Sequence, residues 1–174
     1  MQKIALLTSG GDSPGMNACI RSIVRSVISH NKQAVGVMRG YEGLIHDEFL
    51  DLNARSVSNI LQRGGTILKT ARSKAFMTEE GMKMAYANLC KAGIDGLIVI
   101  GGDGTFKGAV EFNKVSNIPF IGIPGTIDND LFGTDYTIGF DTALNTIINA
   151  VDKIKDTAAS HDRLFFVEVM GRDS

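Results

Sequence analysis

The sequence has little cysteine, little net charge and no long apolar run, and each shortage excludes a class of protein. Lys and Arg number 18 against 19 Asp and Glu, which gives a formal net charge of −1 over 174 residues. Charge this evenly balanced gives no support for binding nucleic acid or a membrane surface through bulk electrostatics. Every apolar run is far shorter than the ~20 residues that a bilayer-spanning helix needs. We therefore expect neither a nucleic-acid nor a membrane partner.

The two cysteines, Cys19 and Cys90, lie far apart within helical patterns and form no CxxC motif. Free cysteines of this kind are usually buried thiols in a reduced compartment. The N-terminal segment MQKIALLTSGG has too few apolar residues before its glycines to act as a secretory signal. These observations predict a cytoplasmic protein whose thiols pack in the core.

The most informative stretch is VIGGDGTFKGAVEFNKVSNIPFIGIPGTIDND, residues 99–130. Gly96–Ile100 is a short apolar run typical of strands buried on both faces, and it runs directly into the glycine-rich Gly101–Thr105. Glycine permits positive φ and lets a ligand approach the backbone closely. The pattern predicts a helix over Phe106–Val115, so backbone N–H groups near Gly104–Gly108 would point at the space above the strand. Geometry and helix dipole together predict an anion site there.

Carboxylates follow on the neighbouring strand. Pro119–Ile123 is typical of a strand, and Pro124–Asp130 is the loop that it delivers beside the glycine turn. Two parallel strands thereby bring a phosphate cradle and three carboxylates, Asp103, Asp128 and Asp130, to one sheet edge. Acid beside a phosphate site favours a divalent cation and a proton acceptor, and hence phosphoryl transfer.

The remaining chain repeats the strand–loop–helix pattern, beginning with a strand at Ile4–Thr8, a glycine-rich loop at 9–15 and a helix at Met16–Ser29. We expect further strands at Gln33–Met38 and Leu164–Val169, an extended segment at Ile67–Arg72, a turn at Tyr41–Gly43, and helices at Ser56–Leu61, from Thr78 to Gly93, and at Phe140–Ser160. This alternation predicts an α/β fold in three αβα layers, with a mainly parallel sheet and right-handed crossovers. Ligands of such sheets bind beyond the carboxyl ends of the strands, where all the glycine loops fall.

The end of the chain differs from the rest. Phe140–Ser160 carries an apolar stripe that a single following strand cannot cover. We therefore expect one nucleotide-binding domain over residues 1–138 and a second, truncated domain beginning at residue 139.

Six segments, TSGGDSPGMNACIR, RGGTILKTAR, GGDGT, PGTIDND, TIGFDTA and VEVMGR, occur in this order. Together they resemble the N-terminal half of the 6-phosphofructokinase family, over essentially the whole chain. GGDGT alone also occurs in lipid and NAD kinases, so the resemblance rests on all six in register. It implies a phosphofructokinase-like fold in which residues 139–174 begin the sugar-phosphate-binding domain. It also implies transfer of the ATP γ-phosphoryl group to the 1-hydroxyl of fructose 6-phosphate, with Mg²⁺ as cofactor, in a homotetramer.

The resemblance assigns roles to matching residues. Asp128 would take the proton of the sugar hydroxyl, and Asp103 and Asp130 would hold Mg²⁺. The groups implied to surround the migrating phosphoryl group are the Gly11 backbone, Arg72, Thr126 and Arg172. The implied ATP contacts are Gly11, Arg72, Ser73, Gly102, Asp103, Gly104, Thr105 and Gly108. The implied sugar-phosphate contacts are Thr126, Ile127, Asp128, Met170, Gly171 and Arg172, with Arg163 reaching into the site of a neighbouring subunit.

Two glycines bear on the phosphoryl donor. Pyrophosphate-using relatives carry Asp where this chain has Gly104 and Lys where it has Gly125. A carboxylate at 104 would crowd and repel the α-phosphate, so the glycines favour ATP. The resemblance also implies an effector site at Arg21, Arg25 and Lys155. The two arginines share a helix face at i, i+4, whereas Lys155 stands where an arginine is usual and an ammonium cannot bind a phosphate bidentately.

Three alternatives stay open from the residues alone. Asp128 and Asp130 also suit a plain Asx-turn with no chemical role. The chain would be a nucleotide-binding segment without catalysis if the missing half of the family's sequence is needed for turnover. A GGDGT-type kinase with NAD or a lipid as acceptor is the third, and Pro124–Asp130 counts against it because those families do not share that segment.

Overall fold

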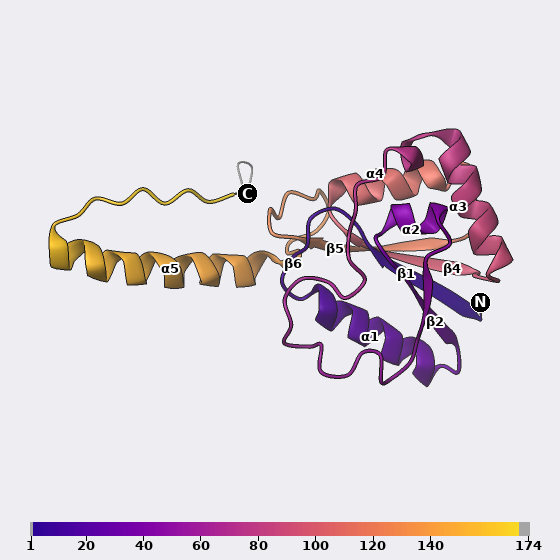
Figure 1. Cartoon of the computed structure of the whole chain (residues 1–174), viewed down its shortest axis with the longest axis horizontal. Helices are drawn as coiled ribbons and strands as arrows, with labels where there is room; N and C mark the ends of the chain where they lie inside the picture. Colours follow the sequence, from indigo (N-terminus) through magenta and orange to yellow (C-terminus); the bar gives the residue numbers. More distant parts are fainter. Residues whose placement is uncertain (1, 171–174) are drawn as a thin grey trace.

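The computed structural model describes residues 2–170 and shows a sheet with helices on both faces (Figure 1). Its strands are β1 (Lys3–Thr8), β2 (Gln33–Val37), β3 (Phe49–Leu52), β4 (Gly96–Gly101), β5 (Phe120–Thr126) and β6 (Ile138–Gly139). Their order across the sheet is β3-β2-β1-β4-β5-β6. All pairings in this sheet are parallel except that of β2 with β3. The predicted α/β class with a mainly parallel sheet is confirmed.

Helices cover the two faces in different numbers. On one face lies α1 (Met16–Ser29), and on the other lie α2 (Tyr41–Ile45), α3 (Glu79–Lys91), α4 (Asp103–Phe112) and a short 3₁₀ turn, η1 (Ala75–Met77) (Figure 1). Each face has its own apolar core, and neighbouring strand residues divide between them. Leu6 of β1 packs in the core under α1, whereas Leu7 packs in the core under α2, α3 and α4. Because β1 is buried on both faces, its sequence is a continuous apolar run.

The ends of α3 follow the predicted signals. The hydroxyl of Thr78 accepts a hydrogen bond of 3.1 Å from the Gly81 amide, and Glu79 and Glu80 occupy the first turn. Gly93, with φ of 68°, follows its last turn. In contrast, α4 begins at Asp103, three residues before the predicted start at Phe106. Glycine at the first turn is tolerated because the first amides of a helix need no partner within it.

Several predicted elements are wrong. Residues 56–61 form turns rather than a helix, because the Asn53 side chain accepts hydrogen bonds from the amides of Arg55 (2.8 Å) and Ser56 (3.1 Å) and so favours a turn. Ile67–Arg72 is not extended, because its first two residues lie in a turn and Lys69 has a φ of 59°. The expected turn at Tyr41–Gly43 is the start of α2. The short strands β3 and β6 had no clear signal in the sequence.

The two cysteines differ in their burial. Cys19 on α1 is half-buried, and burial raises its pKa to about 11, as expected for a packed thiol. Cys90 on α3 is exposed, so the expectation of a core position is wrong for that residue.

Residues 140–170 project away from the rest of the molecule (Figure 1). We call them the arm, and residues 2–139 the body. The helix of the arm, α5 (Phe140–His161), confirms the predicted helix but buries none of its residues. The predicted strand Leu164–Val169 is wrong: these residues are irregular, because no strand lies beside them to supply hydrogen bonds. Among the described residues, no helix has both the length and the apolar character needed to cross a bilayer.

Candidate active site

Three loops meet at the carboxyl ends of β1, β4 and β5. The strand register sets Thr8 beside Ile100 and Gly101 beside Pro124, so the segments that follow these residues leave the sheet side by side. They surround a cavity of about 1160 Å³. This is the position at which open parallel sheets bind ligands.

Most of the residues singled out in the sequence line this one cavity. Those that do are Gly11, Arg72, Ser73, Gly102, Asp103, Gly104, Thr105, Gly108, Thr126, Ile127, Asp128, Asp130 and Met170. The two glycine loops and the carboxylate segment, separated by up to 120 residues in the chain, therefore face one space. An arrangement in which Asp128 lies on a face remote from the Gly101–Thr105 bend is excluded.

The first two loops are held together by hydrogen bonds at their bases. The Ser9 amide donates to the Ile100 carbonyl at 3.0 Å, and the Thr105 hydroxyl donates to the Ser9 carbonyl at 3.0 Å. A side chain at Gly101 would lie 2.4 Å from the Thr105 hydroxyl oxygen, so close contact here requires glycine. The two phosphate-binding candidates thus form a single rigid unit.

The start of α4 offers amides to an anion. The amides of Thr105 and Phe106 both donate to the Gly102 carbonyl. The Asp103 and Gly104 amides precede these first bonds of the helix and lie at its positive end. No atom lies within 4 Å of the position that a Cβ would take at Gly104 or at Gly11, so the backbone is open at both. The amides that are open to an anion are therefore those of residues 103–104, slightly earlier in the chain than the sequence predicts.

The carboxylates differ in their surroundings. Asp103 pairs with Lys107 at 2.6 Å, and this hydrogen bond, reinforced by Coulomb attraction, raises the pKa of Lys107. The pair is solvent-exposed, so a metal or a phosphate can displace the ammonium at little cost. Asp128 is half-buried and Asp130 is exposed. Within residues 2–170, no hydrogen bond to either of these two carboxylates was found, which leaves them available to a ligand.

A magnesium ion fits this set of donors. Mg²⁺ is usually bound by one or two carboxylates together with water and the phosphates of a substrate. The cavity supplies Asp103 and Asp130. In the described residues there is no group of three or more His, Cys, Asp and Glu side chains able to hold a metal by itself. A metal shared with a polyphosphate suits the cavity better than one held by protein alone.

Arg72 and Ser73 reach the cavity on an irregular segment that buried polar side chains hold in place. The Asn17 side chain donates to the carbonyls of Arg63 (3.0 Å) and Gly64 (3.1 Å) and accepts from the Ile67 amide (2.8 Å). The Ser73 hydroxyl accepts from the Phe76 amide at 3.1 Å. Its interaction with Glu42 is the main cause that lowers the pKa of that carboxyl group. These bonds hold the irregular segment that stands where the sequence predicts an extended one, at Ile67–Arg72.

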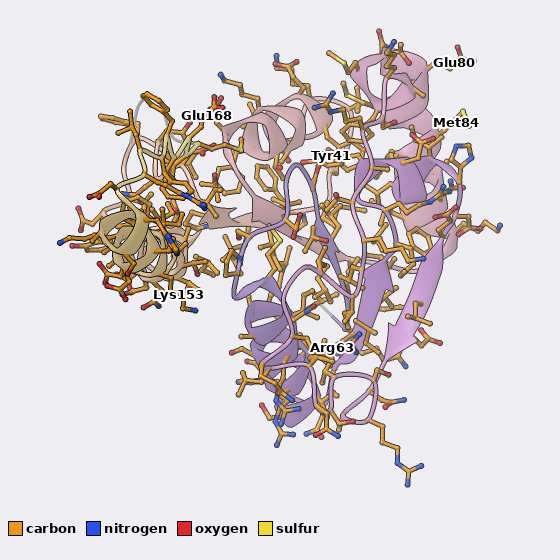
Figure 2. All side chains as sticks on the ribbon, turned by 60° about the vertical axis from the view of Figure 1, so that its left-hand side comes forward. Tyr41, Arg63, Glu80, Met84, Lys153 and Glu168 are labelled. Carbon is orange, nitrogen blue, oxygen red and sulfur yellow. The ribbon has the colours of Figure 1, made fainter. Side chains whose placement is uncertain are left out.

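Two aromatic residues that sequence reasoning missed line the same cavity. Tyr41 and Phe76 stack with ring centroids 4.1 Å apart, and the Tyr41 hydroxyl donates to the Thr105 carbonyl at 2.5 Å. Burial raises the pKa of Tyr41, so the ring stays neutral. Figure 2 shows Tyr41 in the interior of the body. The local sequence GYEG reads only as a turn, and the stacking depends on a partner 35 residues later, so no local signal reveals it.

The other predicted site residues lie elsewhere. Arg163 follows α5 in the arm, where its amide donates to the Ala158 carbonyl at 3.1 Å, and it does not line the cavity. Gly171 and Arg172 lie outside the described residues. Arg21 donates to the Val57 carbonyl at 2.5 Å, Arg25 is exposed on the same helix, and Lys155 is exposed on α5. Lys153, two residues from Lys155, lies well to the side of the sheet (Figure 2).

Comparison with known sequences gives a single family. A family model described as Phosphofructokinase matches residues 3–174. The chain is 59% identical over 172 residues to the ATP-dependent 6-phosphofructokinase 1 of Thermus thermophilus, covering 99% of this chain and 53% of that protein. It is 58% identical over 174 residues to the ATP-dependent 6-phosphofructokinase of Cytophaga hutchinsonii, covering 100% of this chain and 53% of that protein. The chain spans about half the length of the curated relatives it matches.

Comparison with solved structures agrees. The phosphofructokinase of Saccharomyces cerevisiae superposes with a TM-score of 0.92 at 42% identity, over 99% of this chain and 26% of that one. A pyrophosphate-dependent phosphofructokinase from Marinobacter aquaeolei superposes with a TM-score of 0.74 at 20% identity, over 87% of this chain and 42% of that one. The second likeness concerns the fold alone.

Proposed function

Because the chain belongs to the phosphofructokinase family, we propose that it carries the nucleotide site and the proton acceptor of an ATP-dependent 6-phosphofructokinase. The reaction moves the γ-phosphoryl group of ATP to the 1-hydroxyl of fructose 6-phosphate and gives fructose 1,6-bisphosphate and ADP. One observation carries the proposal: the glycine turn after β4 and the carboxylate segment after β5 face one cavity. Phosphoryl transfer depends mainly on positioning and charge neutralisation, which this arrangement supplies.

Residue roles follow from position in the cavity. Asp128 accepts the proton of the sugar hydroxyl as the phosphoryl group arrives, and its unengaged carboxylate supports this role. Arg72 and the backbone at Gly11 neutralise charge on the phosphoryl oxygens, with Thr126 beside them. Asp103 and Asp130 would hold Mg²⁺, which when bound neutralises negative charge on the phosphates. The stacked Tyr41 and Phe76 add an apolar surface to the lining of the cavity.

The choice of ATP over pyrophosphate is supported by the space around two glycines. A side chain at Gly104 would meet no protein atom and would extend into the cavity, where a carboxylate would repel a nucleotide. A Cβ at Gly125 would lie 3.2 Å from Ile100 and 3.4 Å from Met16, so a lysine there needs a shift of the core. Gly104 thus leaves room for a nucleoside triphosphate, and the packing around Gly125 disfavours a lysine there.

Further parts of the proposal concern the whole protein. Residues 1–138 form the nucleotide-binding domain and residues 139–174 begin the sugar-phosphate domain, in a cytoplasmic homotetramer. Arg163 does not line the cavity of its own chain, which supports a role for it in the site of a neighbouring subunit. Arg21, Arg25 and Lys155 would form the effector site, with Arg21 already engaged by the Val57 carbonyl.

A second candidate function is nucleotide binding without transfer by these 174 residues alone. It is favoured because the chain spans 53% of its relative from Thermus thermophilus and because α5 buries none of its residues. A coupled assay on the purified chain distinguishes the two candidates. Wild-type-like turnover would exclude the second, whereas ATP binding without turnover would support it.

The test of the first candidate is made in the complete protein that carries these residues. We expect phosphorylation of fructose 6-phosphate with ATP and none of NAD or diacylglycerol. Asp128→Asn should lower kcat by about 10²–10⁴-fold and leave the KM values nearly unchanged, because only proton transfer is lost. The matched control, Asp152→Asn on exposed α5, should keep full activity. Near-normal kcat in Asp128→Asn would refute the assignment of the proton acceptor.

A further inference from the structure

Asn129 stands between the two carboxylates of the cavity and contributes no charge of its own. Its φ is 50°, in the left-handed region that asparagine tolerates better than most other residues. Its side chain turns to the following loop, where the oxygen accepts from the Thr137 amide at 2.9 Å and the nitrogen donates to the Asp135 carbonyl at 3.1 Å. A single side chain therefore uses both of its polar atoms to hold residues 135–137 against the Asp128–Asp130 turn.

The other end of the turn is closed by threonines. The Thr137 hydroxyl donates to the Thr126 carbonyl at 2.6 Å, and the Asp128 amide donates to the Thr126 hydroxyl at 3.2 Å. Thr137 is 6% exposed, so these bonds are shielded from water. Together with the two Asn129 bonds they make a closed ring through residues 126, 128, 129 and 137.

The ring is anchored to the rest of the cavity. The residue after Thr137 begins β6, which pairs with the end of β5 so that Gly125 lies beside Ile138 and Thr126 beside Gly139. The Ser13 hydroxyl of the first glycine loop donates to the Ile138 carbonyl at 2.9 Å. The position of the carboxylate turn is thereby linked to the loop that carries Gly11.

Neutral side chains, rather than the aspartates, make the local hydrogen bonds of this turn. In a plain Asx-turn the aspartates themselves would bond the backbone. Here the neutral side chains of Thr126 and Asn129 make the local bonds, and within residues 2–170 no such bond involves the carboxylate of Asp128 or of Asp130. The turn is held without consuming either carboxylate.

We propose that Asn129 is a positioning residue for the Asp128 carboxylate, acting by clamping residues 135–137 onto the turn; this rests on the proposed function. Glycine and aspartate each meet only some of the requirements. Glycine adopts the backbone conformation but makes neither bond. Aspartate retains the acceptor for Thr137, loses the donor to Asp135, and adds a third negative charge beside the two already present.

The test uses the complete protein that carries these residues and compares kcat with KM. Asn129→Gly keeps the backbone conformation, so the fold should survive while kcat falls by about 100-fold, the loss typical of a small misplacement of a reacting group. KM for ATP should not change, because the nucleotide contacts lie on other segments. Asn129→Asp, which retains one of the two bonds, should also lower kcat. Asn129→Ala adds backbone strain, so kcat should fall and the melting temperature should fall with it.

Asn31 is the matched control for backbone effects. It too is an asparagine at positive φ, 55°, in a turn after α1 that lies outside the cavity. Asn31→Gly and Asn31→Ala should leave kcat unchanged, although Asn31→Ala should lower the melting temperature. A wild-type kcat in Asn129→Gly would overturn the positioning role. For this comparison kcat is calculated per folded molecule, and circular dichroism measures the folded fraction.

A readout that does not depend on activity separates this inference from the proposed function. Hydrogen exchange of the Thr137 amide should accelerate in Asn129→Gly and not in Asn31→Gly. Unchanged protection of Thr137 would overturn the clamp itself. A wild-type protein that fails to phosphorylate fructose 6-phosphate would instead refute the proposed function, and the exchange result would still decide whether the clamp exists.

Discussion

Helices α1 and α5 have the same kind of sequence, but only α1 has buried residues. Each carries an apolar stripe at helical spacing. In the body, the stripe of α1 is buried against the sheet, with Met16, Ile20 and Val24 at 0% exposure. In the arm, Leu144 is 41% and Ile148 58% exposed, and α5 has no buried residue. An amphipathic pattern thus predicts a helix, but it does not say what covers the apolar face.

The difference matters for function because the cavity lies almost entirely in the body. Only Met170 of the arm reaches it. The body has two apolar cores and a sheet to fix the position of its loops, whereas the arm has a helix and an irregular segment. Nucleotide binding should therefore depend on packing in the body and tolerate change in the arm. Four sets of substitutions test how stability depends on the contacts made in each region.

The largest expected effect is on the stability of the body. Ile20→Ala removes a fully buried side chain and should lower the free energy of unfolding by about 2–5 kcal/mol. Ile148→Ala on α5 removes a side chain that is already 58% exposed and should change it by less than about 0.5 kcal/mol. Urea unfolding followed by circular dichroism measures both. Equal losses would show that the arm is packed in solution and would break the comparison.

The second effect contrasts two glycines of the Gly101–Thr105 bend, of which Gly104 lines the cavity. Gly101→Ala places a Cβ 2.5 Å from the Ser9 carbonyl oxygen and 2.4 Å from the Thr105 hydroxyl, so we expect a loss of about 1–3 kcal/mol from forced displacement of the loop. Gly104→Ala meets no neighbouring atom and should leave stability equal or higher by up to about 1 kcal/mol. Thermal unfolding of the two variants measures these changes in stability. A greater loss in Gly104→Ala would contradict the geometry described for this loop.

These pairs also show why parts of the fold could be predicted. Strands β1 and β4 and the glycine loops that follow them carry strong local signals, because strands buried on both faces are apolar throughout and tight turns need glycine. The shared cavity followed from a general rule of parallel sheets. The residues that bring Asp103 and Asp128 together could therefore be predicted without knowledge of any tertiary contact.

The missed features depend on contacts distant in the sequence. Tyr41 needs the ring of Phe76, and the segment that delivers Arg72 needs the side chain of Asn17. Leu164–Val169 has strand-like composition but no neighbouring strand, and β propensity without a partner does not form a sheet. The bonds of Asn129 could not be predicted for a related reason, since its two partners lie six and eight residues further along an irregular loop.

A smaller effect concerns how helices begin. In the body, α3 starts with the Thr78 side chain bonded to the Gly81 amide, whereas α5 starts at Gly139 with no side-chain cap. Thr78→Ala should cost about 1 kcal/mol of unfolding free energy, and Thr78→Ser should restore most of it because serine caps equally well. Urea unfolding measures both. If Thr78→Ser were as destabilising as Thr78→Ala, the methyl group rather than the cap would be responsible.

The smallest effect is electrostatic and separates the two regions by pH. In the body, Lys91 on α3 pairs with Asp47 after α2 at 2.9 Å, and this hydrogen bond, with Coulomb attraction, raises the pKa of Lys91. A raised pKa in the folded state means that the pair stabilises fully below the unfolded pKa of about 10.4 and loses this contribution as pH rises through the folded pKa. Lys91→Met should therefore have a slightly lower melting temperature than wild type at pH 8, and this gap in melting temperature should close in strong alkali.

The control is Lys153→Met on the arm, where no ion pair was found within residues 140–170. It should show no such gap at either pH. Because the Lys91 pair is exposed, 1 M salt should shrink its gap as well, and a gap insensitive to both pH and salt would mean that Lys91 acts through packing of its alkyl chain rather than its charge.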